Sequence, residues 1–237
     1  MSDYAAPTCE RAPDGAATSP PRSFQTHWYD RPGWREARRY LTFHLLPPAS
    51  GSALLAAVER DQAALAGLPG LDLVPPQWLH LTVQGVAFRE EISRPQRDAL
   101  VHRAGVAIAA LPPLRLSMSP VVEVHREGVL YSGGPVEPVA RLRAALRTAI
   151  RDVLDTVPGS DGERIWPHVS IAYANAATPT DAAVAALART GDGTAVSPTV
   201  EFPAVSLIEL RTRGHLYLWD LVAEIALSRH GTSGSAG

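Results

Sequence analysis

Two short stretches of this chain, WLHLTV (78–83) and WPHVSI (166–171), share the pattern Trp-x-His-apolar-Thr/Ser-apolar. Successive side chains of a strand face opposite sides of a sheet, so the histidine and the hydroxyl of each copy share one face. The apolar residues share the other face, which suits a core. Each copy follows a helical pattern and begins a strand pattern, at equivalent places in the two halves. A fold with one duplicated strand in each of two lobes explains the repeat.

The segments around the two copies alternate between strand and helix patterns. Period-two alternation predicts strands over 40–46, 79–88, 114–125, 128–132, 168–174, 199–211 and 215–227. A period of 3.6 predicts helices over 52–65, 94–111, 136–155 and 180–190, the third with its arginine face in solvent. Turns are expected at Arg126-Glu127-Gly128 and at Arg213-Gly214. This order favours an α+β fold, bilobal, with two pseudo-symmetric lobes of antiparallel sheet and flanking helices around a central cleft.

Length and composition suit one domain of this kind. The chain has 237 residues and is 46% hydrophobic, enough for a sizeable core. Residues 1–22 are rich in Pro, Ala, Ser and Thr and are expected to form a disordered tail, and 231–237 a flexible one. No linker divides the chain after residue 23, so residues 23–230 are expected to form a single bilobal domain.

The charge and cysteine content exclude several classes of protein. A formal net charge of −2 gives no broad positive field for long nucleic acid or for anionic membranes. All 22 cations are arginine, which excludes a Walker-type phosphate loop and any Schiff-base lysine. Cys9 is the single cysteine, so neither an internal disulfide nor a cysteine zinc site is expected. Without a signal-peptide core or a membrane-spanning run, we expect a cytoplasmic monomer without a stable protein partner.

Facing strands would bring the two copies together across the cleft. His80 and His168 would supply two imidazoles, and Thr82 and Ser170 two hydroxyls. Imidazole titrates near 6.5, so one ring can activate water or a hydroxyl while the other protonates a leaving oxygen. The hydroxyls can donate to non-bridging phosphate oxygens, where charge gathers in the transition state. This chemistry needs no metal, and the motifs lack the third ligand of a catalytic zinc site.

The paired His-x-Thr/Ser motifs resemble those of the two-histidine (2H) phosphoesterases, which include 2′-5′ RNA ligase-like proteins and 2′,3′-cyclic nucleotide phosphodiesterases. The resemblance extends over about residues 38–227. It implies that His80 and His168 are catalytic and that Thr82 and Ser170 bind phosphate. It also implies a small nucleotide or RNA-end substrate and no metal or nucleotide cofactor.

Two further residues are candidates for substrate binding. Tyr173 stands where some members of the family place an aromatic ring. In a regular strand it would share the face of Val169 and Ile171 and pack, whereas a bulge would turn it to the histidine face. His44 shares a face with Thr42 and either lines the same cavity or faces solvent.

The residues leave alternatives open. The extension 23–39 either folds over the cleft or lies against one lobe, and His27 within it carries no argument. Hydrolysis, ligation and the assignment of acid and base are not separated by the sequence. A non-catalytic nucleotide- or RNA-binding module on the same fold is the alternative, although recognition alone would not require two acid–base histidines.

Overall fold

The computed structural model describes residues 19–29, 34, 38–48, 51–160, 164–190 and 196–228. The expected N-terminal tail is therefore described only from residue 19, and the expected C-terminal tail lies outside the described residues. The strands are β1 (Tyr40–Leu45), β2 (Leu71–Leu73), β3 (Leu81–Phe88), β4 (Leu114–Met118), β5 (Glu123–His125), β6 (Gly128–Gly134), β7 (His168–Ala174), β8 (Thr199–Phe202), β9 (Ala204–Thr212) and β10 (Tyr217–Ala226). The helices are α1 (Ala53–Leu65), α2 (Arg94–Ile108), α3 (Val136–Arg151) and α4 (Asp181–Ala188).

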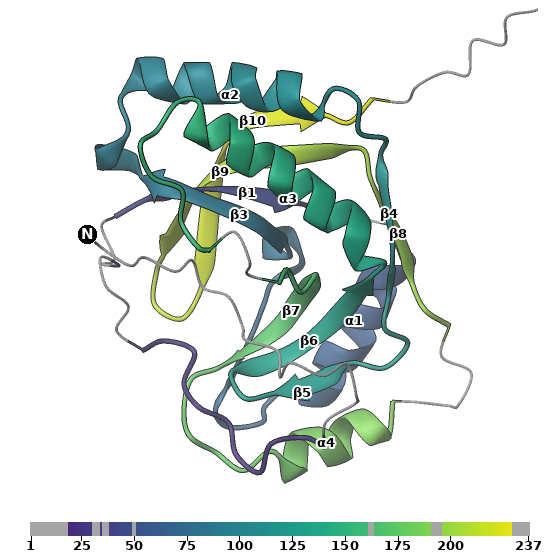
Figure 1. The fold of residues 1–237 in the computed structure, drawn as a ribbon. Coiled ribbons are helices and arrows are strands. Elements are labelled where there is room, and N and C mark those ends of the chain that lie inside the picture. Colours follow the sequence, from purple (N-terminus) through teal and green to yellow (C-terminus); the bar gives the residue numbers. More distant parts are fainter. Residues whose placement is uncertain are drawn as a thin grey trace, which may run out of the picture.

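The strands form two antiparallel sheets (Figure 1). The first has the order β10-β9-β1-β3, and α2 and α3 pack beside it. The second has the order β2-β7-β6-β4-β8, with β5 paired to β6, and α1 and α4 lie on its side of the molecule. The first motif thus lies on an edge strand of one sheet and the second inside the other. The predicted α+β fold with two antiparallel sheets is confirmed.

Local signals in the sequence explain where the helices begin. The Ser52 hydroxyl accepts a hydrogen bond from the Leu55 amide at 3.1 Å and caps α1. Ser93 and Gln96 form a reciprocal capping box at the start of α2. These bonds satisfy amides that have no partner within a helix. No helix among the described residues is long and apolar enough to cross a membrane.

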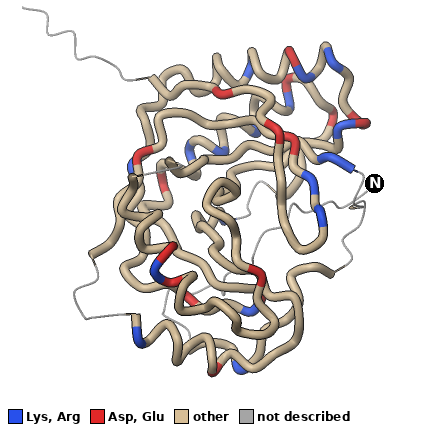
Figure 2. The backbone as a smooth tube through the Cα atoms, turned by 180° about the vertical axis from the view of Figure 1, so that it is seen from behind, with Lys and Arg blue, Asp and Glu red and all other residues tan. Residues whose placement is uncertain are grey.

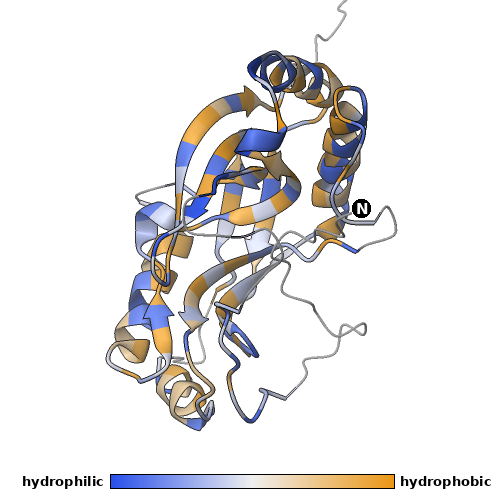
Figure 3. Cartoon of the chain, turned by 90° about the vertical axis from the view of Figure 1, so that its left-hand side faces the viewer, coloured by the Kyte–Doolittle hydropathy of each residue, from blue (hydrophilic) through white to orange (hydrophobic). Residues whose placement is uncertain are grey.

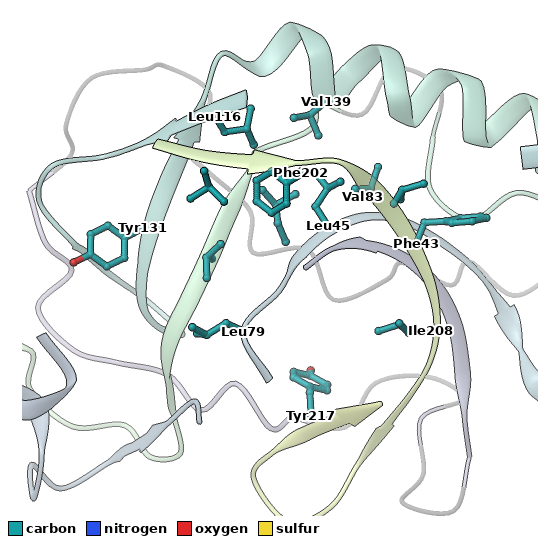
Figure 4. Packing of buried hydrophobic residues seen from close by; sticks show 14 of the residues in the cluster. Phe43, Leu45, Leu79, Val83, Leu116, Tyr131, Val139, Phe202, Ile208 and Tyr217 are labelled. Atoms are coloured by element: carbon teal, nitrogen blue, oxygen red, sulfur yellow. The ribbon is translucent and has the colours of Figure 1, made fainter. Parts of the chain in front are cut away.

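One hydrophobic core joins the two sheets. Its members come from both sheets and from the helices, as Figure 4 shows for Phe43 of β1, Tyr131 of β6 and Val139 of α3. All six residues of β1 are buried because this strand lies between β9 and β3. Hydrophilic and hydrophobic positions alternate along several of the other strands (Figure 3). The same core therefore fixes the two motif strands relative to each other.

Two of the predicted strands are wrong in extent. The segment 114–125 contains two strands, β4 and β5, separated by residues that include Pro120. The segment 199–211 is divided at Pro203 into β8, which joins the second sheet, and β9, which joins the first. Proline has no N–H to continue a ladder, and here it coincides with the points where the chain changes partners.

The expectation that the arginine face of the third helix lies in solvent is wrong for two of its four arginines, while Arg141 and Arg151 are exposed. Arg143 and Arg147 of α3 are buried, and both donate to the Gln84 side-chain oxygen, at 3.0 and 3.1 Å. Arg147 also donates to the carbonyls of Pro158 and Gly159, at 2.6 and 3.0 Å. A buried guanidinium is tolerated when acceptors meet its donors. The acceptors come from β3 and from the segment after the helix, so the periodicity of the helix alone does not reveal them.

Charges of both signs are interspersed over the backbone of the first lobe (Figure 2). Glu209 of β9 forms ion pairs with Arg39 and Arg89, and Asp220 of β10 with Arg39 and Arg211. Apart from Glu209, whose side chain is 12% exposed, the partners are 30–52% exposed, and such surface ion pairs contribute little to stability. Through the pair with Asp220, the guanidinium of Arg211 is bound to a carboxylate within the β9–β10 hairpin.

Candidate active site

Both motifs open into one pocket between the two sheets. Its lining comprises His27, Tyr40, Thr42, His44, His80, Thr82, Glu127, Gly128, Leu130, His168, Ser170, Tyr173, Leu210 and Tyr217. The two histidines and two hydroxyl residues predicted from the repeat are all among them. So are Tyr173 and His44, the two additional candidates. The structure therefore brings together every residue that the sequence singled out for chemistry.

A bulge interrupts β3 directly after its hydroxyl residue. Phe43 of β1 pairs with Gln84 and His44 pairs with Thr82, which leaves Val83 without a partner. An extra residue reverses the alternation of the strand. In a regular strand Gln84 would share the face of Thr82, but here it points toward the arginines of α3 instead.

A second bulge lies at the equivalent place in β7. Ser170 and Ala172 pair with consecutive residues of β6, and Ile171 between them is left over. The reversal places Tyr173 on the pocket side with Ser170, as the sequence analysis expected if a bulge occurred. Tyr173 is also only 6% exposed, so it packs as well as lining the pocket. The two copies of the motif thus share a backbone irregularity as well as a sequence pattern.

Each catalytic candidate is oriented by the tryptophan that precedes it. His80 Nδ1 lies 2.9 Å from the carbonyl oxygen of Trp78, and His168 Nδ1 lies 2.8 Å from that of Trp166. A carbonyl only accepts, so Nδ1 carries the hydrogen in both rings. The lone pair of each neutral imidazole is then on Nε2. This backbone contact ties each histidine to the residue two positions before it, and the sequence pattern did not reveal it.

Burial lowers the pKa of both histidines to about 4. The Trp78 and Trp166 carbonyls offset part of this lowering. Each accepts a hydrogen bond from Nδ1 in both forms of the ring, but the bond is stronger to the charged form, which raises the pKa. Repulsion from His168 and His27 lowers the pKa of His80 further, and repulsion from His125 and His27 lowers that of His168. Near neutral pH both rings are therefore uncharged until an anion enters the pocket.

His44 lies behind the first motif, fully buried. Its ring stacks on that of His80, with centroids 4.6 Å apart and planes 9° apart, and its Nε2 lies 3.3 Å from Thr82 Oγ1. Burial and the nearby His80 hold the pKa of His44 well below its ordinary value, so it stays neutral. The sequence left open whether His44 faces solvent or lines the cavity, and in the structure it lines the cavity.

The unpaired nitrogen of His44 indicates its tautomer. Nδ1 is buried and has no hydrogen-bond partner among the described residues. A buried donor without a partner is rarer than an acceptor without one, which favours hydrogen on Nε2. His44 then donates to Thr82 Oγ1, and the Thr82 hydroxyl proton is free to turn toward the pocket. The arrangement makes Thr82 a hydrogen-bond donor to a bound ligand.

Five residues of the lining that carry polar groups were not predicted as site residues: His27, Tyr40, Thr42, Glu127 and Tyr217. Their partners lie far away in the sequence. His27 contacts Glu127 and Tyr217, which are 100 and 190 positions distant. No local pattern signals such contacts.

The charged groups of the lining are few. Its members, all from the described part of the chain, include no arginine, so Arg126, Arg211 and Arg213 do not line the pocket. Glu127 is the one carboxylate among them. No group of three or more His, Cys, Asp or Glu within the described ranges is arranged to hold a metal ion. Imidazoles and hydroxyls therefore dominate the chemistry of the pocket.

Comparisons with known proteins agree with this arrangement. The model of the 2′-5′ RNA ligase superfamily matches residues 47–214. No curated protein matches the chain. TT0787 of Thermus thermophilus is similar in structure, with a TM-score of 0.58 and 19% identity, over 79% of this chain and 97% of that one. E. coli LigT complexed with 3′-AMP is similar with a TM-score of 0.55 and 16% identity, over 81% of this chain and 99% of that one. ATU0111 of Agrobacterium tumefaciens is similar with a TM-score of 0.52 and 14% identity, over 81% of this chain and 86% of that one. At these identities the likeness concerns the fold.

Proposed function

The chain belongs to the 2′-5′ RNA ligase superfamily, and on this premise we propose that it is a metal-independent phosphoesterase with His80 and His168 as general acid and base. Its proposed substrate is a small phosphodiester: a 2′,3′-cyclic phosphate, a 2′-5′ linkage or an RNA-end phosphate. One observation carries the proposal. Two imidazoles, one directly before β3 of the first sheet and one at the start of β7 in the second, are held through Nδ1 in the same way and line the same pocket.

The proposed hydrolysis uses the two Nε2 atoms in opposite protonation states. The neutral ring removes a proton from water as the water oxygen bonds to phosphorus. The protonated ring donates its Nε2 hydrogen to the ribose oxygen as the bond from that oxygen to phosphorus breaks. The pair thus ends with its single proton on the other ring. Thr82 and Ser170 donate to the non-bridging oxygens, where negative charge develops.

The low pKa values of the two rings fit this cycle. A phosphodiester carries one negative charge, which favours the protonated form of a nearby imidazole. Binding of the substrate therefore raises the pKa of the pair, which takes up one proton from the solvent. Repulsion between His80 and His168 disfavours a second proton. The substrate itself selects the state with one acid and one base.

A nucleotide is the first substrate class to test. LigT of E. coli, whose fold is similar, was crystallised with 3′-AMP. The lining of this pocket offers hydroxyls and imidazoles at its motifs and aromatic rings around them. Such groups suit one phosphate with an attached nucleoside better than a long anionic chain, for which several cations are needed.

The decisive experiment is a turnover assay on cyclic nucleotides and 2′-5′ dinucleotides, with and without EDTA. We expect wild-type turnover that survives EDTA, and a loss of about 10²–10⁴-fold in H80A and in H168A. His102 lies exposed on α2, so H102A is the matched control and should behave as wild type. Full activity of both single variants would disprove the proposal. Nucleotide binding without turnover, unchanged in H80A and H168A, would instead support the binding module.

A further inference from the structure

The segment before β1 builds one wall of the pocket. Its backbone follows the second sheet: the amides of Phe24, Gln25 and His27 donate to the carbonyls of Thr178, Arg126 and Ala174, at 2.8, 2.7 and 2.7 Å. These bonds carry His27 to the pocket, where its side chain is 8% exposed. Of the two arrangements considered for the extension, its described part combines both: it lies along one lobe and reaches the cleft.

His27 is held on both nitrogens by residues of the pocket. Its Nδ1 lies 2.9 Å from Glu127 Oε2, in the turn between β5 and β6, and its Nε2 lies 2.9 Å from the Tyr217 hydroxyl on β10. Its ring stacks on Tyr173 of β7, with centroids 4.4 Å apart. Three separate parts of the fold therefore fix one imidazole, with Glu127 on one ring nitrogen and Tyr217 on the other.

The proton on His27 decides which way the Tyr217 hydroxyl points. Glu127 only accepts, so Nδ1 always carries a hydrogen. In neutral His27, Nε2 is an acceptor and takes the hydroxyl hydrogen of Tyr217. In protonated His27, Nε2 donates to the Tyr217 oxygen, and the hydroxyl hydrogen is released toward the pocket. Protonation of His27 therefore converts Tyr217 into a donor.

The charge balance of the pocket favours the protonated state when an anion is bound. The lining contains Glu127 and no arginine among the described residues. With neutral His27 the carboxylate repels a phosphate, whereas with protonated His27 the two charges cancel. The groups that face His27 include Glu127, Tyr217, Tyr173 and Trp28, and its charge also acts on His80 and His168.

We propose that Glu127, His27 and Tyr217 form a relay, in which protonated His27 turns the hydroxyl hydrogen of Tyr217 toward a bound phosphate. Tyr217 contacts the phosphate, and Glu127 and His27 are positioning residues that act through it. The relay deepens the proposed function and rests on it for the identity of the substrate. It adds a third donor beside Thr82 and Ser170, supplied through a segment outside the matched residues 47–214.

Binding of inorganic phosphate tests the relay without requiring turnover. Calorimetric titrations at pH 5.5 and pH 8 would compare wild type, Y217F, E127Q and the double variant. Y217F removes one oxygen and should weaken binding at pH 5.5 by about 10-fold, the usual effect of losing a hydrogen bond to a charged group. E127Q removes the repulsion of the carboxylate whether or not Tyr217 is present, and it also holds the proton of His27 less tightly. The affinity of E127Q relative to its Glu127 counterpart should therefore fall as pH rises, and this fall should be smaller in the Y217F background. The exposed Tyr29 provides the control variant Y29F, and thermal unfolding checks the fold of each protein.

Three results would overturn the relay: wild-type protein that fails to bind phosphate at pH 5.5, Y217F that binds as tightly as wild type, or an E127Q effect with the same pH dependence in both backgrounds. Turnover of a cyclic nucleotide, measured on the same preparations, keeps the two proposals apart. Turnover by wild type with an unaffected Y217F removes the relay alone. Phosphate binding that depends on Tyr217 in a protein without turnover supports the relay and removes the phosphoesterase activity.

Discussion

The motif beside β3 and the motif on β7 hold their histidines alike but differ in what surrounds them. Both tie Nδ1 to a tryptophan carbonyl, and both strands bulge after the hydroxyl residue. His80 stacks on the buried His44, whereas His168 lies beside the partly exposed Trp166 ring, at 4.8 Å. The backbone of the site is therefore duplicated, while its side-chain environment has diverged.

The position three residues after each hydroxyl shows how far this divergence goes. In β7 it is Tyr173, which lines the pocket. In β3 it is Gly85, where an added Cβ would lie 2.5 Å from the Tyr40 hydroxyl. Each copy thus receives an aromatic ring at this place, from its own strand in one case and from β1 in the other. Equivalent space is filled from different parts of the sequence.

The largest effect should come from removing both imidazoles together. If the two rings act as one acid–base pair, the H80A/H168A variant should lose no more than about 10-fold beyond the worse single variant. Turnover of a 2′,3′-cyclic nucleotide measures this. Multiplied losses would mean that the two halves act independently.

Loss of either hydroxyl should be the next largest effect. T82V and S170A should each lower kcat by about 10²-fold, since each removes one donor to the developing charge. Thermal unfolding should change little, because both side chains are only partly buried. Retention of kcat in one variant would show that only one half of the duplicated site contacts the phosphate.

His44 distinguishes the first motif from the second. H44F keeps a ring stacked on His80 but removes the donor to Thr82, so it should lower kcat by about 10-fold. The loss should disappear in the T82V background, because the hydroxyl that His44 orients is then absent. An equal loss from H44F in wild-type and T82V backgrounds would contradict the proposed tautomer.

The pH dependence follows from the lowered pKa values. The acid must be protonated, and that form is lost as pH rises through about 4, so the maximum of kcat/KM should lie well below pH 6.5. The profile of kcat should lie at higher pH, because the bound phosphate favours the imidazolium. A kcat/KM maximum above pH 7 in the wild-type protein would contradict this account.

The smallest effect should come from replacing His125, whose charge affects the pKa of only one histidine of the pair. Its repulsion lowers the pKa of His168 but is not a cause of the shift at His80. H125Q should therefore raise the pKa of His168 alone and move one limb of the kcat/KM profile to higher pH. An equal displacement of both limbs would show that the two environments are not separate.

The sequence was informative where a property is local. Periodicity located the motif strands and the four helices, and the repeat singled out His80, Thr82, His168 and Ser170 before their arrangement was known. It was uninformative where the partner of a residue is distant. The burial of Arg143 depends on Gln84, and the place of His27 depends on Tyr217. The sequence left open whether β7 contains a bulge, because the register of a strand is set by its pairing with the neighbouring strand.

The most direct test of the account is the protonation of the two imidazoles, read by nitrogen-15 NMR and assigned with H80A and H168A. At pH 7 without ligand, both rings should carry hydrogen on Nδ1 and a free Nε2. Addition of inorganic phosphate should shift the Nε2 signals of both rings toward the protonated form, because one proton is shared across one pocket. Hydrogen on Nε2 in either free ring, or a response confined to one ring, would contradict the account.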